Sequence, residues 1–336
     1  MSIVNNTQVV DRTSAINIIP FKPSLIGALS LFREKTVGTD SITFDVKDNA
    51  LFVLEDHLRN TDGKNALNPE EYDIHTLAIP HYPVETTITR NQLSGLRGFG
   101  KETENAIEGA VASELVRHGE MQDNHYEYLQ AMMVCQGVIS TTYYGDIDME
   151  TEFGVTRTPV NIDMSAGTDM AAQLRAAIKV SKDGLTSGGR TSGFVVLAGV
   201  TWFDTFMAQD TIAANTLLKG DSPLRNELGS IGNGYSMYRF GNIDIVLYDD
   251  TFSTKVGGTI QPLADDKAVL IPRTVLGSSF FAPVSKLSGI NAQGAKRFAS
   301  SYRDPKDRFV EMESEQNTLV VMEQIAAVVE LTFTTV

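Results

Sequence analysis

The sequence predicts a mixed α+β fold that is organised around one long helix. Residues 99–139 contain no proline, and apolar side chains such as Ile107, Leu115, Tyr126 and Met133 recur there at helical spacing. Short runs typical of strands lie before and after this helix, without a repeating strand–helix unit. The fold class is therefore expected to be α+β, and not doubly wound α/β.

The helix over 99–139 is expected to be a rod against which other layers pack. Acidic residues crowd its first turn, where the helix dipole favours negative charge. If unbroken, it would be roughly 50–60 Å long at 1.5 Å per residue. Gly109 and Gly119 each cost roughly 1 kcal/mol in a helix interior, so a bend would be tolerated there. An ordinary core helix of a large domain explains the pattern equally well.

The N-terminal part is expected to contain an arm, a helix and a strand. Residues 1–13 are polar, show no period and are typical of an extended arm. Pro23 stands near the start of a short amphipathic helix over 24–33. Apolar residues alternate cleanly over 41–47, which predicts a strand with one wet face.

A polar segment, 48–75, follows this strand and is too long for an ordinary connection in a compact domain. It is expected either to be disordered or to project as an arm that becomes ordered against something else. The chain returns as a second extended stretch, 76–86, which Pro80 and Pro83 confine to a sheet edge or a strand end. Contact with another subunit and a mobile loop are about equally consistent with this excursion.

Two shorter helices and several strands are expected after the long helix. Thr168 is a candidate N-cap and Gly184 a candidate C-cap for a helix over 169–183, and Thr201 is expected to open another helix. The apolar run 194–198 predicts a strand buried on both faces. The other expected strands are 141–149, 159–164, 236–240, 243–248, 267–272, 308–312, 318–322 and 328–333.

Composition and charge exclude several classes of protein. The chain of 336 residues is long enough for two or three compact units, and its net charge of −14 argues against tight, charge-driven nucleic-acid binding. No signal-peptide pattern opens the sequence, and Glu323 and Glu330 interrupt its most apolar C-terminal run, so no membrane span is expected. Cys135 is the only cysteine and is expected to be a small buried apolar residue. The sequence predicts an acidic, soluble, intracellular chain.

No pattern predicts catalytic, cofactor-binding or metal-binding residues. The histidines are scattered at 57, 75, 81, 118 and 125. His118 and His125 stand two turns apart, too far for the usual metal-binding pair, and are expected at the surface or half-buried. The glycines at 229, 232 and 234 lack the order of a nucleotide-binding fingerprint and predict a turn. Acidic pairs expected to face water are Glu70 and Glu71, Asp249 and Asp250, and Asp265 and Asp266.

Five stretches, in this order and at this spacing, carry a further signal. They read LSLFRE at 29–34, IPHYPVE at 79–85, YRFGNIDIVLY at 238–248, GINA at 289–292 and DPKDRFVEMES at 304–314. Together they resemble the lambda-type major capsid proteins of tailed double-stranded DNA phages, the major capsid protein E family. Each stretch alone is a weak signal, whereas five in register span nearly the whole chain.

The resemblance implies the tailed-phage major capsid fold, which is also that of the herpesvirus capsid floor and of encapsulins. It implies an N-terminal arm over 1–36 and an extended loop, a β-hairpin arm lying over a neighbouring subunit, over 37–95. A peripheral domain with the spine helix would occupy 96–165, and an axial domain 166–294. The strands in 295–336 would complete the peripheral domain.

The same resemblance implies a structural protein and not an enzyme. Its copies would form pentamers and hexamers of an icosahedral phage head, which encloses DNA without sequence-specific binding and expands from a procapsid. Scaffolding, portal and decoration proteins are the implied partners, and assembly in the host cytoplasm would end in the virion. Lys64 lies in the arm suited to a lysine–asparagine cross-link, but a solvated lysine is expected. An encapsulin-like compartment shell and a soluble α+β enzyme or binding protein are the alternatives.

Overall fold

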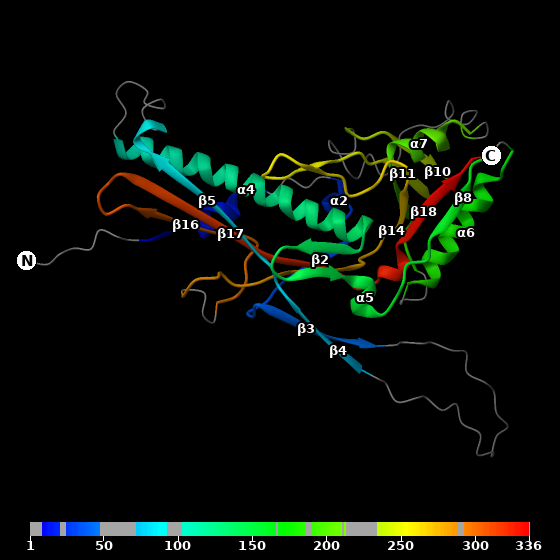
Figure 1. The fold of residues 1–336 in the computed structure, drawn as a ribbon, viewed down its shortest axis with the longest axis horizontal. Helices are drawn as coiled ribbons and strands as arrows, with labels where there is room; N and C mark the ends of the chain where they lie inside the picture. The colour runs from blue at the N-terminus through cyan, green and yellow to red at the C-terminus, as the bar shows by residue number, and fades with distance from the viewer. Residues whose placement is uncertain are drawn as a thin grey trace, which may run out of the picture.

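The computed structural model is an elongated α+β molecule with two six-stranded sheets and one long helix (Figure 1). It describes residues 9–20, 25–47, 72–92, 103–165, 167–185, 190–209, 212, 234–287 and 292–335. The helices are α1 (Thr13–Ile18), α2 (Leu25–Ala28), α4 (Thr103–Cys135), α5 (Met149–Phe153), α6 (Met170–Asp183), α7 (Val200–Met207) and the 3-10 helix η3 (Ile325–Ala327).

The strands fall into the two large sheets and three two-stranded ones. Those before α6 are β1 (Val10–Asp11), β2 (Phe32–Thr36), β3 (Ser41–Lys47), β4 (Tyr72–Ala78), β5 (His81–Thr89), β6 (Val138–Thr141), β7 (Gly145–Asp148) and β8 (Val160–Asp163). Those after it are β9 (Phe194–Ala198), β10 (Met237–Phe240), β11 (Ile243–Leu247), β12 (Phe252–Ser253), β13 (Thr259–Ile260), β14 (Ala268–Pro272), β15 (Gly277–Phe281), β16 (Phe298–Arg303), β17 (Phe309–Met322) and β18 (Val329–Thr334).

The first sheet is built on the long strand β17. Its order is β1-β16-β17-β15-β2, and β5 also pairs with β17. Strand β16 pairs with residues 310–315, β15 with residues 318–322, and β5 with residues 309–317. The two strands predicted at 308–312 and 318–322 are thus one strand. Four of the five polar residues between them, Ser314, Glu315, Gln316 and Asn317, are buried, and their polarity hid the continuity of the strand in the sequence.

Helix α4 packs along this sheet against β17 (Figure 1). Its 33 residues span about 50 Å at 1.5 Å per residue, so the predicted rod is confirmed. Its predicted end is wrong, because the helix stops at Cys135 and residues 138 and 139 begin β6. The apolar residues that predicted it, including Leu115, Tyr126 and Met133, are buried.

The second sheet has the order β10-β11-β9-β14-β18-β8, with α6 packed on β8, β14 and β18 and α7 on β11. The predicted strand β9 is buried at all five residues. Sheet membership departs from the predicted segments at three strands. Strands β8 and β18, expected in the peripheral segments, belong to this second sheet, whereas β15, expected in the axial segment 166–294, pairs with β17 in the first.

The described part of segment 1–36 belongs to the body and is not an extended arm. Strand β1 pairs with β16, α1 and α2 pack on α4, and β2 runs parallel to β15. The helix expected over 24–33 is only the four-residue α2, because Ser30 adopts a left-handed conformation with φ 52° and the chain then continues as β2. Burial of Ile16, Leu25 and Ile26 fixes this segment in place.

The hairpin β3–β4 projects from the body (Figure 1). Among the described residues, its two strands pair only with each other, from Ser41 opposite Ala78 to Lys47 opposite Tyr72. The strand expected at 41–47 is confirmed, whereas residues 48–71 of the predicted excursion, with Lys64, lie outside the described residues. Strand β5 continues into the first sheet, where Pro83 is accommodated on a strand whose one partner in the described chain is β17.

Two of the expected helix N-caps are wrong, by one residue in α6 and by two in α7. Helix α6 is capped by Asp169 and not by Thr168, because the Asp169 carboxylate accepts hydrogen bonds from the amides of the first turn. Gly184 is its C-cap, as predicted. Helix α7 begins at Val200, before the expected Thr201. Its N-cap Gly199 lies so close to the backbone of Ala264 that a Cβ would sit 2.3 Å from that carbonyl oxygen.

Candidate assembly surfaces

Helix α4 turns a buried polar side toward the first sheet and the N-terminal segment. Its members are His118, Gln122, Asp123, Glu127 and Gln130, each at most 6% exposed. A hydrogen bond of 2.8 Å joins His118 Nδ1 to Ser314 Oγ on β17, and one of 2.7 Å joins its Nε2 to Thr86 Oγ1 on β5. The rod is therefore held to the sheet by directional bonds as well as by apolar contacts. His118 is buried, which corrects the expected surface or half-buried position.

Asp123 anchors α1 through Arg297. The Arg297 Nη2 donates to Asp123 Oδ1, and both side chains are buried. The Nη1 of the same guanidinium donates to the carbonyl oxygens of Ile16 and Ile19, at 3.3 and 3.4 Å. These carbonyls close the C-terminal end of α1, where a cation is favoured by the helix dipole. Residues from three distant parts of the chain therefore meet at one buried charge pair.

Glu127, one turn after Asp123, anchors α2. Its carboxylate accepts hydrogen bonds from the backbone amides of Ile26 and Gly27 at 2.8 and 3.0 Å. These amides lack partners inside the short helix, so the carboxylate satisfies them. Sequence reasoning missed both anchors, because acidic residues inside an amphipathic pattern normally mark its solvated side.

A serine, a histidine and a glutamate meet at the end of β5, but not in an order that supports nucleophilic catalysis. His81 Nδ1 lies 2.7 Å from Asn317 Oδ1, 3.3 Å from Ser285 Oγ and 3.3 Å from Glu315 Oε2. A catalytic relay needs the hydroxyl and the acid on different ring nitrogens. Here both face the same nitrogen, so the ring cannot pass a proton from Ser285 toward Glu315.

The remaining residues singled out in the sequence have structural roles where they are described. Burial raises the pKa of the Cys135 thiol to about 12, so it is a neutral, buried group at physiological pH. Asp250 does not simply face water, because it accepts a 2.6 Å hydrogen bond from the Tyr235 hydroxyl, and burial raises the pKa of its carboxyl. Asp249, Asp265 and Asp266 are exposed, as expected. The acidic pair at 70–71, the histidine at 57 and the glycines at 229 and 232 lie outside the described residues.

The described residues contain no group of three or more histidine, cysteine, aspartate or glutamate side chains arranged to hold a metal ion. Within the same part of the chain, no helix combines the length and apolar character that crossing a membrane requires.

His125 makes stability dependent on pH. Its ring packs edge-on against Tyr82, with 4.2 Å between the ring centroids, and burial lowers its pKa to about 4. The unfolded chain binds a proton at this residue near pH 6.5, whereas the folded chain resists protonation until about pH 4. The stability that this group contributes is therefore complete above pH 6.5 and is lost as the pH falls toward 4.

We expect acidification from pH 7.5 to pH 5 to cost about 2 kcal/mol through His125. Urea unfolding midpoints of the wild type and His125→Phe at the two pH values measure this. The phenylalanine variant keeps the ring packing but not the proton site, so its midpoint should shift less with pH. Identical shifts in the two proteins would contradict the prediction.

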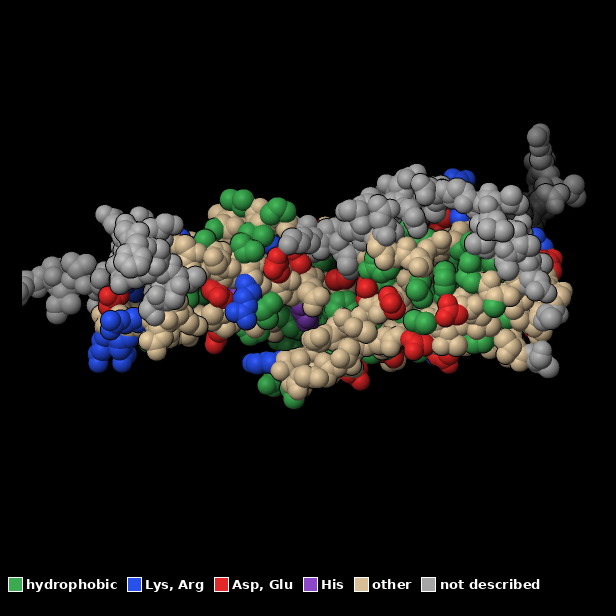
Figure 2. All heavy atoms as spheres, turned by 90° about the horizontal axis from the view of Figure 1, so that it is seen from above, with side chains coloured by type: hydrophobic (Ala, Val, Ile, Leu, Met, Phe, Trp, Pro, Cys, Tyr) green, Lys and Arg blue, Asp and Glu red, His purple; other side chains and the backbone are tan. Residues whose placement is uncertain are grey.

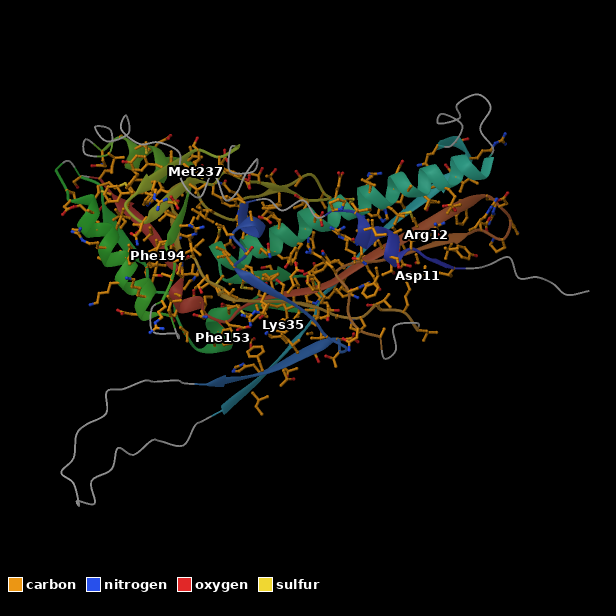
Figure 3. All side chains as sticks on the ribbon, turned by 180° about the vertical axis from the view of Figure 1, so that it is seen from behind. Asp11, Arg12, Lys35, Phe153, Phe194 and Met237 are labelled. Carbon is orange, nitrogen blue, oxygen red and sulfur yellow. The ribbon has the colours of Figure 1, made fainter. Side chains whose placement is uncertain are left out.

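Protruding and exposed groups form the surfaces available to other molecules. Midway along hairpin β3–β4, Phe44 contacts Phe153 of α5, with 5.3 Å between ring centroids, so the inner half of the hairpin is attached to the body. Phe153 is labelled in Figure 3. Farther out, Ile74 is 67% exposed. Acidic side chains are spread among uncharged ones over the face shown in Figure 2. A projecting hairpin with an exposed apolar residue is suited to contact with another protein surface.

Comparison with known proteins agrees with this geometry. Residues 8–333 match the family described as phage major capsid protein E. The major capsid protein of Pseudomonas phage KPP10 is 25% identical over a 340-residue alignment, which covers 96% of this chain and 95% of that protein. A crystal structure assigned to a prophage capsid protein of E. coli CFT073 has a TM-score of 0.65 at 13% identity, covering 97% of this chain and 100% of that chain. The mature capsid of bacteriophage PhiM1 has a TM-score of 0.54 at 10% identity, covering 93% and 88%.

Proposed function

Because this chain belongs to the phage major capsid protein E family, we propose that its copies assemble as pentamers and hexamers into a closed icosahedral head around double-stranded DNA. The protein is a major capsid protein of a tailed phage, a structural component of the virion. The resemblance inferred from the five sequence stretches is thereby confirmed, and the fold is the tailed-phage major capsid fold. This family favours the phage head over the compartment-shell and soluble-enzyme alternatives.

The projecting β3–β4 hairpin is the observation that carries the proposed assembly. Its strands pair only with each other within the described chain, and it extends away from both sheets (Figure 1), with His75 of β4 lying 3.2 Å from Glu152 of α5. A two-stranded hairpin is at best marginally stable in water by itself. Ile42 and Leu77 are already buried in this chain, so contact with a neighbouring subunit would cover the exposed Ile74. Many such contacts, one from the hairpin of each copy, would add to a large total through avidity.

The two sheets are proposed to form the two domains of the subunit. The first sheet with α4 would form the peripheral domain, and the second sheet with α6 and α7 the axial domain that gathers at the five- and six-fold axes. Expansion from a procapsid would require α4 and the β-hairpin arm to have two stable arrangements. The hydrogen-bonded side of α4 supports this, because such bonds can be exchanged between discrete partners while the helix stays intact.

The acidic chain would form a wall along which packaged DNA slides. With a net charge of −14, it repels phosphates over distances of about 10 Å at moderate salt. Scaffolding, portal and decoration proteins are proposed as further partners, and the host cytoplasm as the place of assembly, on the basis of the family alone.

A deletion of residues 49–68 tests the proposed assembly. The deleted residues lie outside the described part, in the excursion that continues β3 and β4. We expect the shortened subunit to remain soluble and folded but to form no closed shells, because residues 49–68 of the predicted arm are missing while β3 and β4 remain. Negative-stain electron microscopy of the expressed wild type and deletion variant, with circular dichroism as a folding control, measures this. Normal particles from the deletion variant would refute the role of residues 49–68, and a wild type that stays a compact monomer at high concentration would refute assembly.

A further inference from the structure

The most exposed aromatic side chain among the described residues is held at the tip of a rigid turn. Tyr143 is 92% exposed at the end of the β6–β7 hairpin, beside Tyr144, which is 48% exposed. The Thr141 hydroxyl accepts a 3.0 Å hydrogen bond from the Tyr144 amide and donates a 2.7 Å bond to the Gly145 carbonyl oxygen. The turn is therefore pre-organised, so binding of Tyr143 to a partner would cost little conformational entropy in this turn.

A groove of about 450 Å³ lies between α4 and the β12–β13 hairpin. Its apolar lining comes from Met121 and Tyr128 of α4 and from Phe252 and Ile260 of the hairpin. Tyr128 and Phe252 meet edge to face, with 5.4 Å between ring centroids, which leaves a preformed aromatic wall. At its rim, Met121 is 49% exposed, and Val256 in the adjoining turn is 97% exposed.

The charged and polar groups beside the Tyr143 turn complement those at the rim of the groove. Asp146 is exposed three residues after Tyr143, and Lys255 is exposed at the rim of the groove. Neither of them forms an ion pair with any residue that the structure describes. The exposed side-chain amide of Asn124 also lines the groove and can form a hydrogen bond with the hydroxyl of an entering tyrosine.

We propose that Tyr143 of one copy inserts into the Met121–Phe252 groove of a second copy, while Asp146 pairs with Lys255 across the contact. This inference rests on the proposed assembly and assigns one of its contacts. In the view of Figure 1, the β12–β13 segment (yellow) runs on one side of α4 and the β6–β7 hairpin (green) on the other. Because the tip and the groove are different surfaces of one chain, their contact can be heterologous and repeat from copy to copy around a ring. A second copy is the occupant that the chain favours, because it carries both halves of the contact with opposite charges.

An engineered disulfide tests the contact directly. Tyr143→Cys combined with Ser253→Cys places thiols at the tip and at the groove, and the buried native Cys135 should not compete. Under mild oxidation, assembled particles of this variant should give a ladder of linked chains on a non-reducing gel. The matched control pairs Tyr143→Cys with Ser113→Cys, an exposed position on α4 outside the groove, and should give no ladder.

Assembly titrations measure how much the proposed contact contributes to assembly. Tyr143→Ala should raise the protein concentration at which particles appear at least about tenfold, while Tyr143→Phe stays within about threefold of the wild type. The melting temperature of the unassembled Tyr143→Ala subunit should equal that of the wild-type subunit, because the Tyr143 ring is almost fully exposed in the single chain. Asp146→Lys or Lys255→Glu alone should also weaken assembly, and the two together should restore it.

Two negative results have different meanings. Wild-type particles that form at the same concentration as those of Tyr143→Ala, with no ladder from the Tyr143–Ser253 pair, overturn this contact and leave the proposed function standing. A wild type that forms no particles or capsomers overturns the proposed function and this contact together.

Discussion

Replacing Arg297 by alanine should lower the free energy of unfolding by about 3–5 kcal/mol. The substitution leaves the Asp123 carboxylate buried without the guanidinium, and it removes the donor to the C-terminal carbonyls of α1. A buried charge that loses its partner keeps the full cost of its lost hydration. Urea unfolding of the dissociated subunit measures the loss, and α1 should exchange its amide hydrogens faster.

Two controls separate the buried pair from a general loss of charge. Arg117→Ala removes a side chain of α4 that is 67% exposed and paired with Glu114, and should change stability by less than about 1 kcal/mol. The double variant Arg297→Met with Asp123→Leu should be more stable than Arg297→Ala, because no unpaired charge remains. A loss below about 1 kcal/mol for Arg297→Ala itself would contradict the anchoring role.

Gly277→Ala should cost about 3 kcal/mol in the free energy of unfolding and disturb the end of the β15–β17 pairing in the first sheet. A Cβ at this position would lie 2.0 Å from the Val321 carbonyl oxygen and 2.9 Å from the Met322 Cα. Both are backbone atoms of β17, so no side-chain rotation relieves the overlap, and the pairing of β15 with β17 must shift. Urea unfolding, together with a shell-assembly assay, measures the effect.

Gly109→Ala is the matched control for this substitution. It lies inside α4, and a Cβ there meets no atom within 4 Å. Alanine is the better helix former, so this variant should gain about 0.5–1 kcal/mol. Wild-type stability for Gly277→Ala would show that β15 can move away from β17 without cost.

Elements whose signal is local were predictable. The long helix, the alternating strand β3 and the apolar strand β9 each carry their pattern within one continuous stretch of residues. The five family stretches were predictable for the same reason, since each is a short local sequence. Strand β17 was divided in two because Glu315, Gln316 and Asn317 interrupt its apolar pattern, although all three are buried.

The sequence alone determined the fold class, the long helix, most strands and the family, because these depend on periodicity and on short ordered motifs. Only the tertiary structure decided which strands share a sheet, that residues 9–36 pack within the body, and that Asp123 and Glu127 lie inside it. A buried carboxylate is stable only beside its donors, here Arg297 and the amides of α2. Those donors lie about 100 residues or more away along the chain, so no local pattern could reveal them.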